Sequence, residues 1–213
     1  MSLPGVPRRQ GKELDHGAFP RDKYYAIACK ALEYARRHLT TKAVAQYVLD
    51  TLGKPHARKV LLLSDKNMAD YMRETFTHGI RELLGAGAVD FPAFDFMYDY
   101  PTDTPPNKLD KKQLYGQGFS YSHRLPHLHI DRENLEGRIR QHEFDAIIYA
   151  CTEGRPPYVD TVLTHYDASS IAVINGEDWR RDWGSFRNEN NTNQLLFGKA
   201  TFFWREMPPT CGI

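Results

Sequence analysis

The chain has few cysteines, no long apolar run and almost no net charge. Its 213 residues include three cysteines, Cys29, Cys151 and Cys211, too few and too widely spaced for a disulfide framework or a zinc finger. We therefore expect a reducing compartment, the cytoplasm. No apolar run approaches the roughly 18–20 residues that a membrane span needs. The net charge of +1 would not attract nucleic acid non-specifically.

The chain also lacks the common phosphate-binding motifs. Neither a G-x-G-x-x-G pattern nor a Walker A loop follows any apolar run. This absence excludes the standard sites for dinucleotides and nucleoside triphosphates. After the first apolar run the chain continues instead with Ser64 and Asp65. Asp65 is suited to capping the helix that follows.

Apolar runs alternate with segments of helical spacing, which is typical of βαβ units and a parallel sheet. We predict an α/β fold, a three-layer Rossmann-like sandwich with a mostly parallel sheet of about five strands. The strand order 2-1-3-4-5 and the order 3-2-1-4-5 both stay open. The predicted strands are residues 59–64, 93–98, 145–150, 170–174 and 201–204.

The part of the chain before the first strand is predicted to be helical. Residues 23–39 and 41–52 have helical spacing, and Gly53 and Pro55 end the second segment. We expect these helices to form an N-terminal extension that packs on the core. The predicted organisation is a flexible lead-in, a helical extension and a Rossmann-like domain, at residues 1–22, 23–55 and 56–213.

Polar and charged residues directly follow four of the predicted strands. In open α/β sheets, ligands bind outside the carboxyl ends of the strands. We therefore expect one candidate site at this edge of the sheet. Its predicted members are Asp65, Glu153, Arg155, Asn175, Glu177, Asp178, Arg205 and Glu206.

Each of these groups has two interpretations. Glu177 and Asp178 suit a general base or the binding of sugar hydroxyls, but Asp178 also suits a helix cap after an Asn-Gly turn. Arg205 suits bidentate contact with a phosphate or carboxylate, or an internal ion pair with one of the nearby carboxylates. The loop at residues 152–155 is either an anion-binding site or a plain turn. The two prolines that follow it lack N–H donors, which weakens the anion-binding interpretation.

A long segment at residues 99–130 contains glycines flanked by aromatic residues. Tyr115, Gly116 and Gly118 belong to the run Tyr-Gly-Gln-Gly-Phe. Aromatic faces suit stacking against a sugar or a base, and they equally suit packing on the core. A segment of this length is either disordered or functional.

His127, His129 and Asp131 would share one face of an extended segment. This pattern resembles the start of the zinc signature of metallo-β-lactamase-like hydrolases. The resemblance ends at Arg132, where that signature has histidine, so we predict no metal site. Cys151 follows a strand, and we expect it to be a small buried hydrophobe.

Four segments carry a resemblance to one family, at residues 115–119, 144–149, 173–178 and 202–207. They look like segments of glycosyltransferase-like proteins of the spore-maturation kind, which resemble the two-Rossmann (GT-B) glycosyltransferases. Those proteins have a Gly-Glu-Asp turn after one strand and an aromatic-x-Arg-Glu ending at a later one. This chain departs from the pattern at Trp204, where that family has lysine or arginine.

The resemblance spans residues 58–207 and implies sugar transfer from a nucleotide-sugar donor. GT-B enzymes hold their site between two such domains, and this chain has room for one. The first domain in that family faces the acceptor. The leading hypothesis is therefore an acceptor-side half of a two-domain enzyme, or a remnant of one. It would take a sugar or nucleotide sugar as substrate, need no cofactor, and meet a second domain or another copy of itself.

Two other functions stay open. The domain is alternatively a non-catalytic Rossmann-like binding or assembly module, in which the charges pair internally. A metal-dependent hydrolase using His127 and His129 is the second alternative. The geometry of the folded chain distinguishes a ligand-binding site from an assembly module. A binding site needs these charged side chains to point into a cleft, whereas in an assembly module they form salt bridges with one another.

Overall fold

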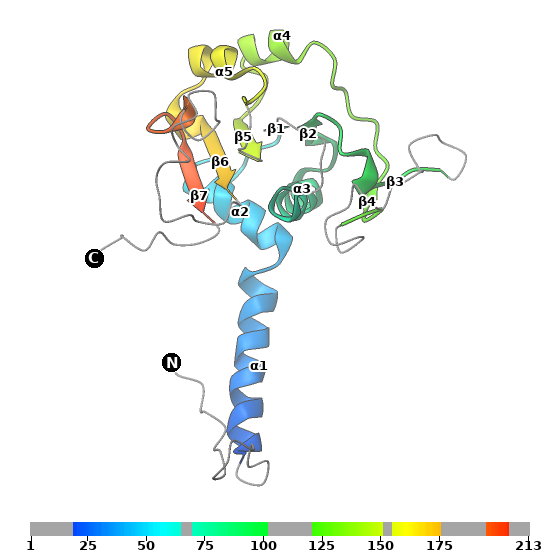
Figure 1. Cartoon of the computed structure of the whole chain (residues 1–213), viewed down its shortest axis with the longest axis vertical. Coiled ribbons are helices and arrows are strands. Elements are labelled where there is room, and N and C mark those ends of the chain that lie inside the picture. The colour runs from blue at the N-terminus through cyan, green and yellow to red at the C-terminus, as the bar shows by residue number, and fades with distance from the viewer. Residues whose placement is uncertain (1–18, 65–69, 102–120, 151–154, 176–194, 205–213) are drawn as a thin grey trace. The chain divides into compact units, whose positions relative to one another are not determined.

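The computed structural model describes residues 19–64, 70–101, 121–150, 155–175 and 195–204 (Figure 1). The chain divides into two compact units, Met1–Thr40 and Thr41–Ile213. The first unit contains helix α1 (Arg21–His38), and the second contains the sheet and every other described helix. None of the helices in the described part combines the length and apolar composition that a membrane span requires.

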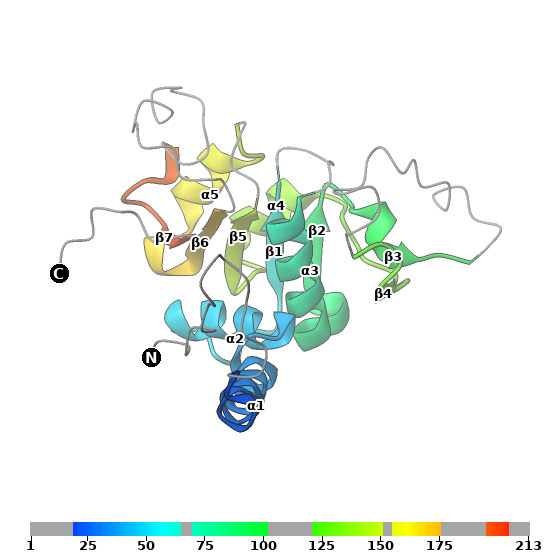
Figure 2. The same cartoon turned by 60° about the horizontal axis from the view of Figure 1, so that its bottom comes forward.

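The second unit is built on a five-stranded, fully parallel sheet (Figure 2). The strand order is β2-β1-β5-β6-β7, so the predicted parallel α/β sheet is confirmed and the order follows the 2-1-3-4-5 alternative. The strands are β1 (Val60–Leu63), β2 (Ala88–Phe91), β5 (Ala146–Ala150), β6 (Ile171–Asn175) and β7 (Thr201–Trp204).

Helices cover both faces of the sheet, which makes the predicted three-layer sandwich. Successive side chains of a strand point to opposite faces. In β1, Val60 and Leu62 therefore join the core on one face, whereas Leu61 and Leu63 join the core on the other. The first core includes side chains of α2 (Thr41–Thr51) and α3 (Tyr71–Leu84), and the second includes those of α4 (Leu135–Arg140) and α5 (Val159–His165).

Helix α2 lies directly against α3. A Cβ atom added to Gly79 of α3 would lie 2.0 Å from the carbonyl oxygen of Thr41, so only glycine permits this close approach. The Thr41 hydroxyl also lies within hydrogen-bonding distance of His78 Nδ1, at 2.9 Å. Three apolar side chains of α2 are buried, Ala45, Val48 and Leu49. The contact makes α2 part of the α/β unit.

The second strand was predicted in the wrong place. The prediction was residues 93–98, but β2 is Ala88–Phe91. A carboxylate, Asp90, interrupts its short apolar run, and that charge is neutralised by arginines from elsewhere in the chain. The aromatic residues that follow form a 3-10 turn, η3 (Asp95–Met97), and strand β3 (Tyr98–Asp99), which pairs with β4 (Leu125–Pro126).

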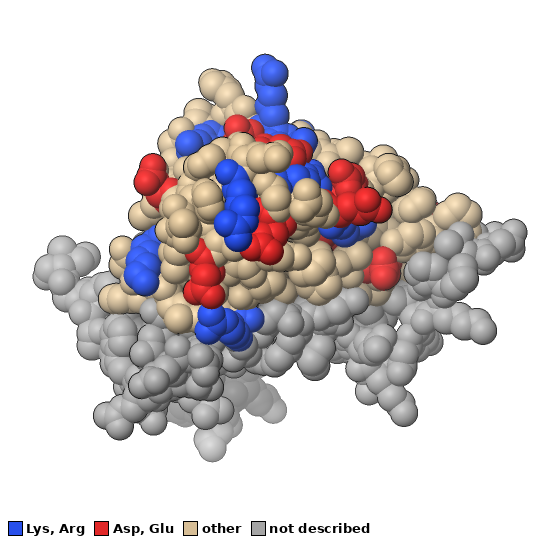
Figure 3. Space-filling view, turned by 90° about the horizontal axis from the view of Figure 1, so that it is seen from above, with Lys and Arg blue, Asp and Glu red and all other residues tan. Residues whose placement is uncertain are grey.

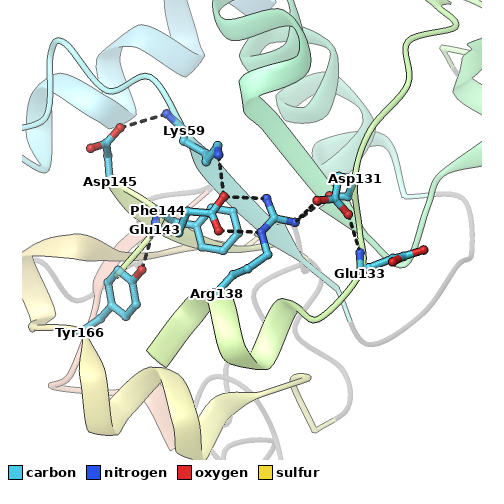
Figure 4. Close-up of polar contacts among 8 residues, drawn as sticks. All are labelled: Lys59, Asp131, Glu133, Arg138, Glu143, Phe144, Asp145 and Tyr166. Atoms are coloured by element: carbon cyan, nitrogen blue, oxygen red, sulfur yellow. Dashed lines mark hydrogen bonds and ion pairs between the residues drawn. The ribbon is translucent and has the colours of Figure 1, made fainter. Parts of the chain in front are cut away.

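A partly exposed cluster of charges joins the amino ends of β1 and β5 (Figure 4). Asp145 Oδ2 accepts hydrogen bonds from the backbone N–H groups of Arg58 and Lys59, at 2.7 and 2.9 Å. Glu143 accepts from Arg138 Nε at 2.9 Å and pairs with Lys59 Nζ. Because Arg138 and Lys59 lower it, the pKa of the Glu143 carboxyl falls from 4.5 to about 2. This edge lies opposite the one where ligands bind in such sheets, and its contacts are those of a structural clamp.

Candidate functional site at the carboxyl edge of the sheet

The strand order places a topological switch point between β1 and β5. The chain passes from β1 through α3 to β2 on one side, and from β5 to β6 and β7 on the other. In open parallel sheets, ligands bind in the crevice outside the carboxyl ends of the strands at such a point. The candidate site is therefore the group of polar residues at the ends of β1 and β6 and the start of α3, namely Ser64, Asp70, Arg73, Glu74 and Asn175.

A buried arginine lies at the end of β1. Arg73 is 1% exposed, and its Nη1 donates a 2.9 Å hydrogen bond to the Ser64 hydroxyl. Its guanidinium carbon lies 4.3 Å from the ring centre of Phe94, in the geometry of a cation–π contact. A guanidinium held in this way is oriented before any ligand arrives, which suits the recognition of a phosphate or carboxylate.

The first turn of α3 also carries a buried carboxylate. Glu74 is fully buried, and its two oxygens accept from the backbone N–H groups of Asp70 and Tyr121, each at 3.1 Å. Burial raises the pKa of the Glu74 carboxyl above 4.5, against the opposing effect of these hydrogen bonds and of Arg73. Asp70 caps the helix by accepting from Arg73 N at 2.9 Å. Glu74 thus ties Tyr121, which lies within the long segment at residues 99–130, to the start of α3.

Two of the predicted site residues lie within the described part of the chain. Asn175 is the last residue of β6 and is 2% exposed, so its amide is positioned at the carboxyl edge as expected. Arg155 is half-exposed and forms a 2.8 Å ion pair with Asp160 of α5. The other predicted members lie outside the described residues: Asp65, Tyr115, Gly116, Gly118, Glu153, Glu177, Asp178, Arg205 and Glu206.

Sequence reasoning missed the charged residues on the buried face of α3. Arg73, Thr77 and Arg81 are spaced by four, so they form one stripe along the helix, and each is at least 96% buried. The stripe lies beside the apolar residues Phe76 and Ile80, which are also buried. The regular spacing of Arg73, Thr77 and Arg81 was the available signal.

The far end of this stripe meets Asp90 of β2. Arg81 Nη2 lies 2.9 Å from Asp90 Oδ1, and Arg132 Nη2 lies 2.6 Å from the same oxygen. The other carboxylate oxygen accepts from Phe94 N at 3.0 Å. Arg81 also donates to the Tyr98 hydroxyl at 2.6 Å, and burial raises the pKa of that hydroxyl. We call Arg81, Asp90, Tyr98 and Arg132 the Asp90 cluster.

The histidines of the metal hypothesis, His127 and His129, are not members of the Asp90 cluster. The His127 ring packs against Tyr100 with 4.5 Å between ring centres, and both His127 and His129 are exposed. Asp131 accepts from Glu133 N at 2.9 Å and lies 3.6 Å from Arg138 Nη1. The described residues contain no group of three or more His, Cys, Asp or Glu side chains arranged to hold a metal ion. Arg132, which replaces histidine in the motif, belongs to the Asp90 cluster.

The face that carries α4 and α5 shows charges of both signs side by side (Figure 3). Arg140 pairs with Glu136 at 2.6 Å, and Arg155 pairs with Asp160. Among the residues that the structure describes on this face, neither sign gathers into a patch.

No protein-family model matches this chain, and neither a curated protein nor a solved structure does.

Proposed function

We propose that the unit Thr41–Ile213 is a glycosyltransferase-like domain that binds a sugar or nucleotide sugar at the carboxyl edge of its sheet. In this proposal it is the acceptor-side half of a two-domain sugar-transfer enzyme, or a remnant of one. The proposal rests on the resemblance of residues 115–119, 144–149, 173–178 and 202–207 to that family. A fold of this kind hosts many functions, so the assignment depends on the site.

The observation that carries the proposal is the buried pair at the switch point. Arg73 and Ser64 are joined by a 2.9 Å hydrogen bond at the end of β1, the strand next to the switch. The N-terminus of α3 adds its backbone dipole at the same place. A fixed guanidinium beside a helix N-terminus favours an anionic group of the substrate, a phosphate or a carboxylate.

The roles of the carboxylates after β6 remain predictions. Glu177 and Asp178 follow the buried Asn175 by two and three positions. In the proposal one of them binds acceptor hydroxyls, or acts as general base where catalysis survives. Arg205, which directly follows β7, is assigned to a phosphate or carboxylate of the substrate.

Binding is tested by thermal shift and calorimetry with UDP-glucose, UDP-N-acetylglucosamine and GDP-mannose. A ligand at a hundred times its dissociation constant adds about 2.7 kcal/mol of stability, which raises the melting temperature measurably. We expect this rise in the natural chain and in Arg140→Met, an exposed control on α4. We expect it to vanish in Arg73→Met.

Two further variants protect this test from misfolding. Ser64→Ala removes only the hydroxyl that accepts from Arg73 and should weaken binding while the circular dichroism spectrum is kept. Glu177→Gln and Asp178→Asn should lower turnover of a sugar acceptor more than they lower binding. The proposal fails if no nucleotide sugar or free sugar binds the folded chain, or if Arg73→Met and Arg140→Met bind equally well.

The second candidate is a non-catalytic Rossmann-like binding or assembly module. It is favoured by the internal pairing of charges in the described part of the chain, which includes Arg81 with Asp90, Arg138 with Glu143, and Arg155 with Asp160. This candidate predicts that no sugar is transferred under any condition. Binding of a nucleotide sugar followed by its hydrolysis or transfer would exclude it.

A further inference from the structure

Helix α1 has an apolar face whose large side chains are exposed. None of the residues of this 18-residue helix is buried. Tyr25, Leu32 and Leu39 are 62%, 52% and 63% exposed, and they recur every seven residues. Apolar side chains that are gathered in one exposed stripe mark an interaction surface, and most helical stability in proteins comes from the packing of such a face. We therefore expect another surface to pack against this face of α1.

The spacing of this face is that of a coiled-coil seam. Tyr25, Ala28, Leu32, Ala35 and Leu39 are separated alternately by three and four residues, as at positions a and d of a heptad. The opposite face carries Lys30, Glu33 and Arg37, of which the last two form an i,i+4 ion pair at 2.6 Å, together with Ile27 and Tyr34. A seam of this kind packs against another helix rather than against a flat sheet.

Large and small residues alternate along the seam, and this alternation favours one orientation. In a parallel pair, each Tyr or Leu would meet its own copy, and each Ala would meet Ala, which leaves the seam alternately crowded and empty. In an antiparallel pair centred on Lys30, Tyr25 of one copy lies opposite Ala35 of the other, and Leu32 lies opposite Ala28. The four layers formed by Tyr25, Ala28, Leu32 and Ala35 then each combine one large and one small side chain, which interdigitate, and Leu39 lies beyond them, opposite Arg21.

The charges at the two ends of α1 fit the same register. The first turn carries Asp22, and the last turn carries Arg36, Arg37 and His38. In the antiparallel pair centred on Lys30, Asp22 of each copy lies beside Arg36 of the other, at flanking positions of the seam. The helix dipoles also run in opposite directions, which is favourable.

We propose that α1 pairs with α1 of a second copy of this chain, as a symmetric antiparallel two-helix coiled coil. The interface is self-complementary, as a two-fold homodimer requires. This inference goes beyond the sugar-binding proposal and does not depend on it. Its observations all lie within α1 and Leu39.

The test measures the mass of the full-length chain by sedimentation over a range of concentrations. We expect a dimer whose dissociation constant rises at least about tenfold in Leu32→Glu, because the new charge would be buried in the seam. The matched control is Ala26→Glu, which introduces the same side chain on the opposite face. It should dimerise like the natural chain.

A charge exchange tests the orientation. Asp22→Arg and Arg36→Asp should each weaken the dimer, and the double variant should recover it, because the ion pair is restored with its ends exchanged. A parallel pair would not bring these positions together, so it predicts no recovery. Failure of the double variant to recover overturns the antiparallel register.

Cys29 provides a second test of that register. The thiol is free and exposed, and it lies one residue from the proposed two-fold axis, on the same flank as Asp22 and Arg36. In a chain that carries Cys151→Ser and Cys211→Ser, a short thiol-to-thiol crosslinker should therefore yield a covalent dimer, which the addition of Cys29→Ser should abolish. A dimer that is seen by sedimentation but that the crosslinker cannot join through Cys29 would contradict the register.

Three results would overturn the pairing itself. The first is a chain that stays monomeric at every concentration. The second is a dimer that is indifferent to Leu32→Glu, or equally sensitive to Ala26→Glu. The third is a monomer that uses the same face to bind phosphatidylglycerol vesicles, with binding lost in Leu32→Glu. Because all these readouts are independent of sugar binding, failure here leaves the proposed function untouched.

Discussion

The α/β unit contains two clusters of charges that share their chemistry and differ in burial. In the Asp90 cluster, the side chains of Asp90 and Arg81 are 1% and 2% exposed. In the cluster at the amino edge, the side chains of Glu143 and Lys59 are 30% and 41% exposed. Water can replace a lost partner in the second cluster but not in the first. The comparison teaches that the buried cluster depends on being complete, whereas the edge cluster contributes a small stability that varies with pH.

The largest effect is expected from Asp90→Ala. Removal of this carboxylate leaves the Arg81 guanidinium buried without its counter-charge and also frees Phe94 N. The expected loss in the free energy of unfolding is about 3–5 kcal/mol, measured by urea denaturation. The double variant Arg81→Met with Asp90→Leu should lose less than Asp90→Ala alone, because it leaves fewer buried charges unpaired. Equal losses of unfolding free energy in the single and the double variant would mean that the buried cluster does not depend on being complete.

An intermediate effect is expected from Arg132→Met. Arg132 donates to both the backbone carbonyl and the carboxylate of Asp90, at 2.8 and 2.6 Å, but its side chain is 24% exposed. Asp90 keeps Arg81 and Phe94 N as partners in this variant. The expected loss is about 1–3 kcal/mol by the same denaturation experiment. A loss as large as that of Asp90→Ala would mean that Arg132, rather than burial, dominates the cluster.

A smaller, pH-dependent effect is expected from Glu143→Gln. Arg138 and Lys59 hold the folded-state pKa of Glu143 at about 2, below its ordinary value of 4.5. The ionised carboxylate therefore stabilises the fold above pH 4.5, and this contribution is lost as the pH falls from about 4.5 to about 2. Glu143→Gln should flatten the stability profile in that range. An unchanged slope between pH 5 and pH 2, measured by thermal denaturation, would assign the acid sensitivity to other carboxylates.

The smallest effect is expected from Arg155→Ala. Its ion pair with Asp160 joins side chains that are 51% and 83% exposed. Pairs of this kind contribute about 0–1 kcal/mol, so the melting temperature should barely move. A large destabilisation would show that Arg155 makes stabilising contacts in addition to its ion pair with Asp160.

The sequence was sufficient for four of the five strands, because their apolar runs are uninterrupted. The strands predicted at residues 59–64, 145–150, 170–174 and 201–204 match β1, β5, β6 and β7. The exception is β2, where Asp90 lies in the middle of a four-residue strand. In the pattern of a single sequence, a carboxylate normally indicates a solvent-exposed position. The arginines that neutralise it are nine and 42 positions away along the chain.

The candidate site was only partly predictable for the same reason. The edge of the sheet and Asn175 followed from the rule that ligands bind beyond the carboxyl ends of the strands. Arg73 and Glu74 were not found, because charged residues within a helical pattern are normally assigned to its solvent face. Their burial depends on Ser64, Phe94 and Tyr121, which only the folded chain brings to the start of α3.

The glycine at the crossing of α2 and α3 has a consequence for recognising related chains. An alanine at position 79 would place its methyl group 2.0 Å from a carbonyl oxygen, and one at position 87 would do so at 2.1 Å from the carbonyl oxygen of Arg58. Neither backbone can retreat without moving a whole helix or the start of β1. A distant homologue that keeps glycine at both positions should keep α2 against α3 and the start of β1 against the turn after α3. A homologue with a larger residue at position 79 must place α2 in a different position, even when its strands are similar.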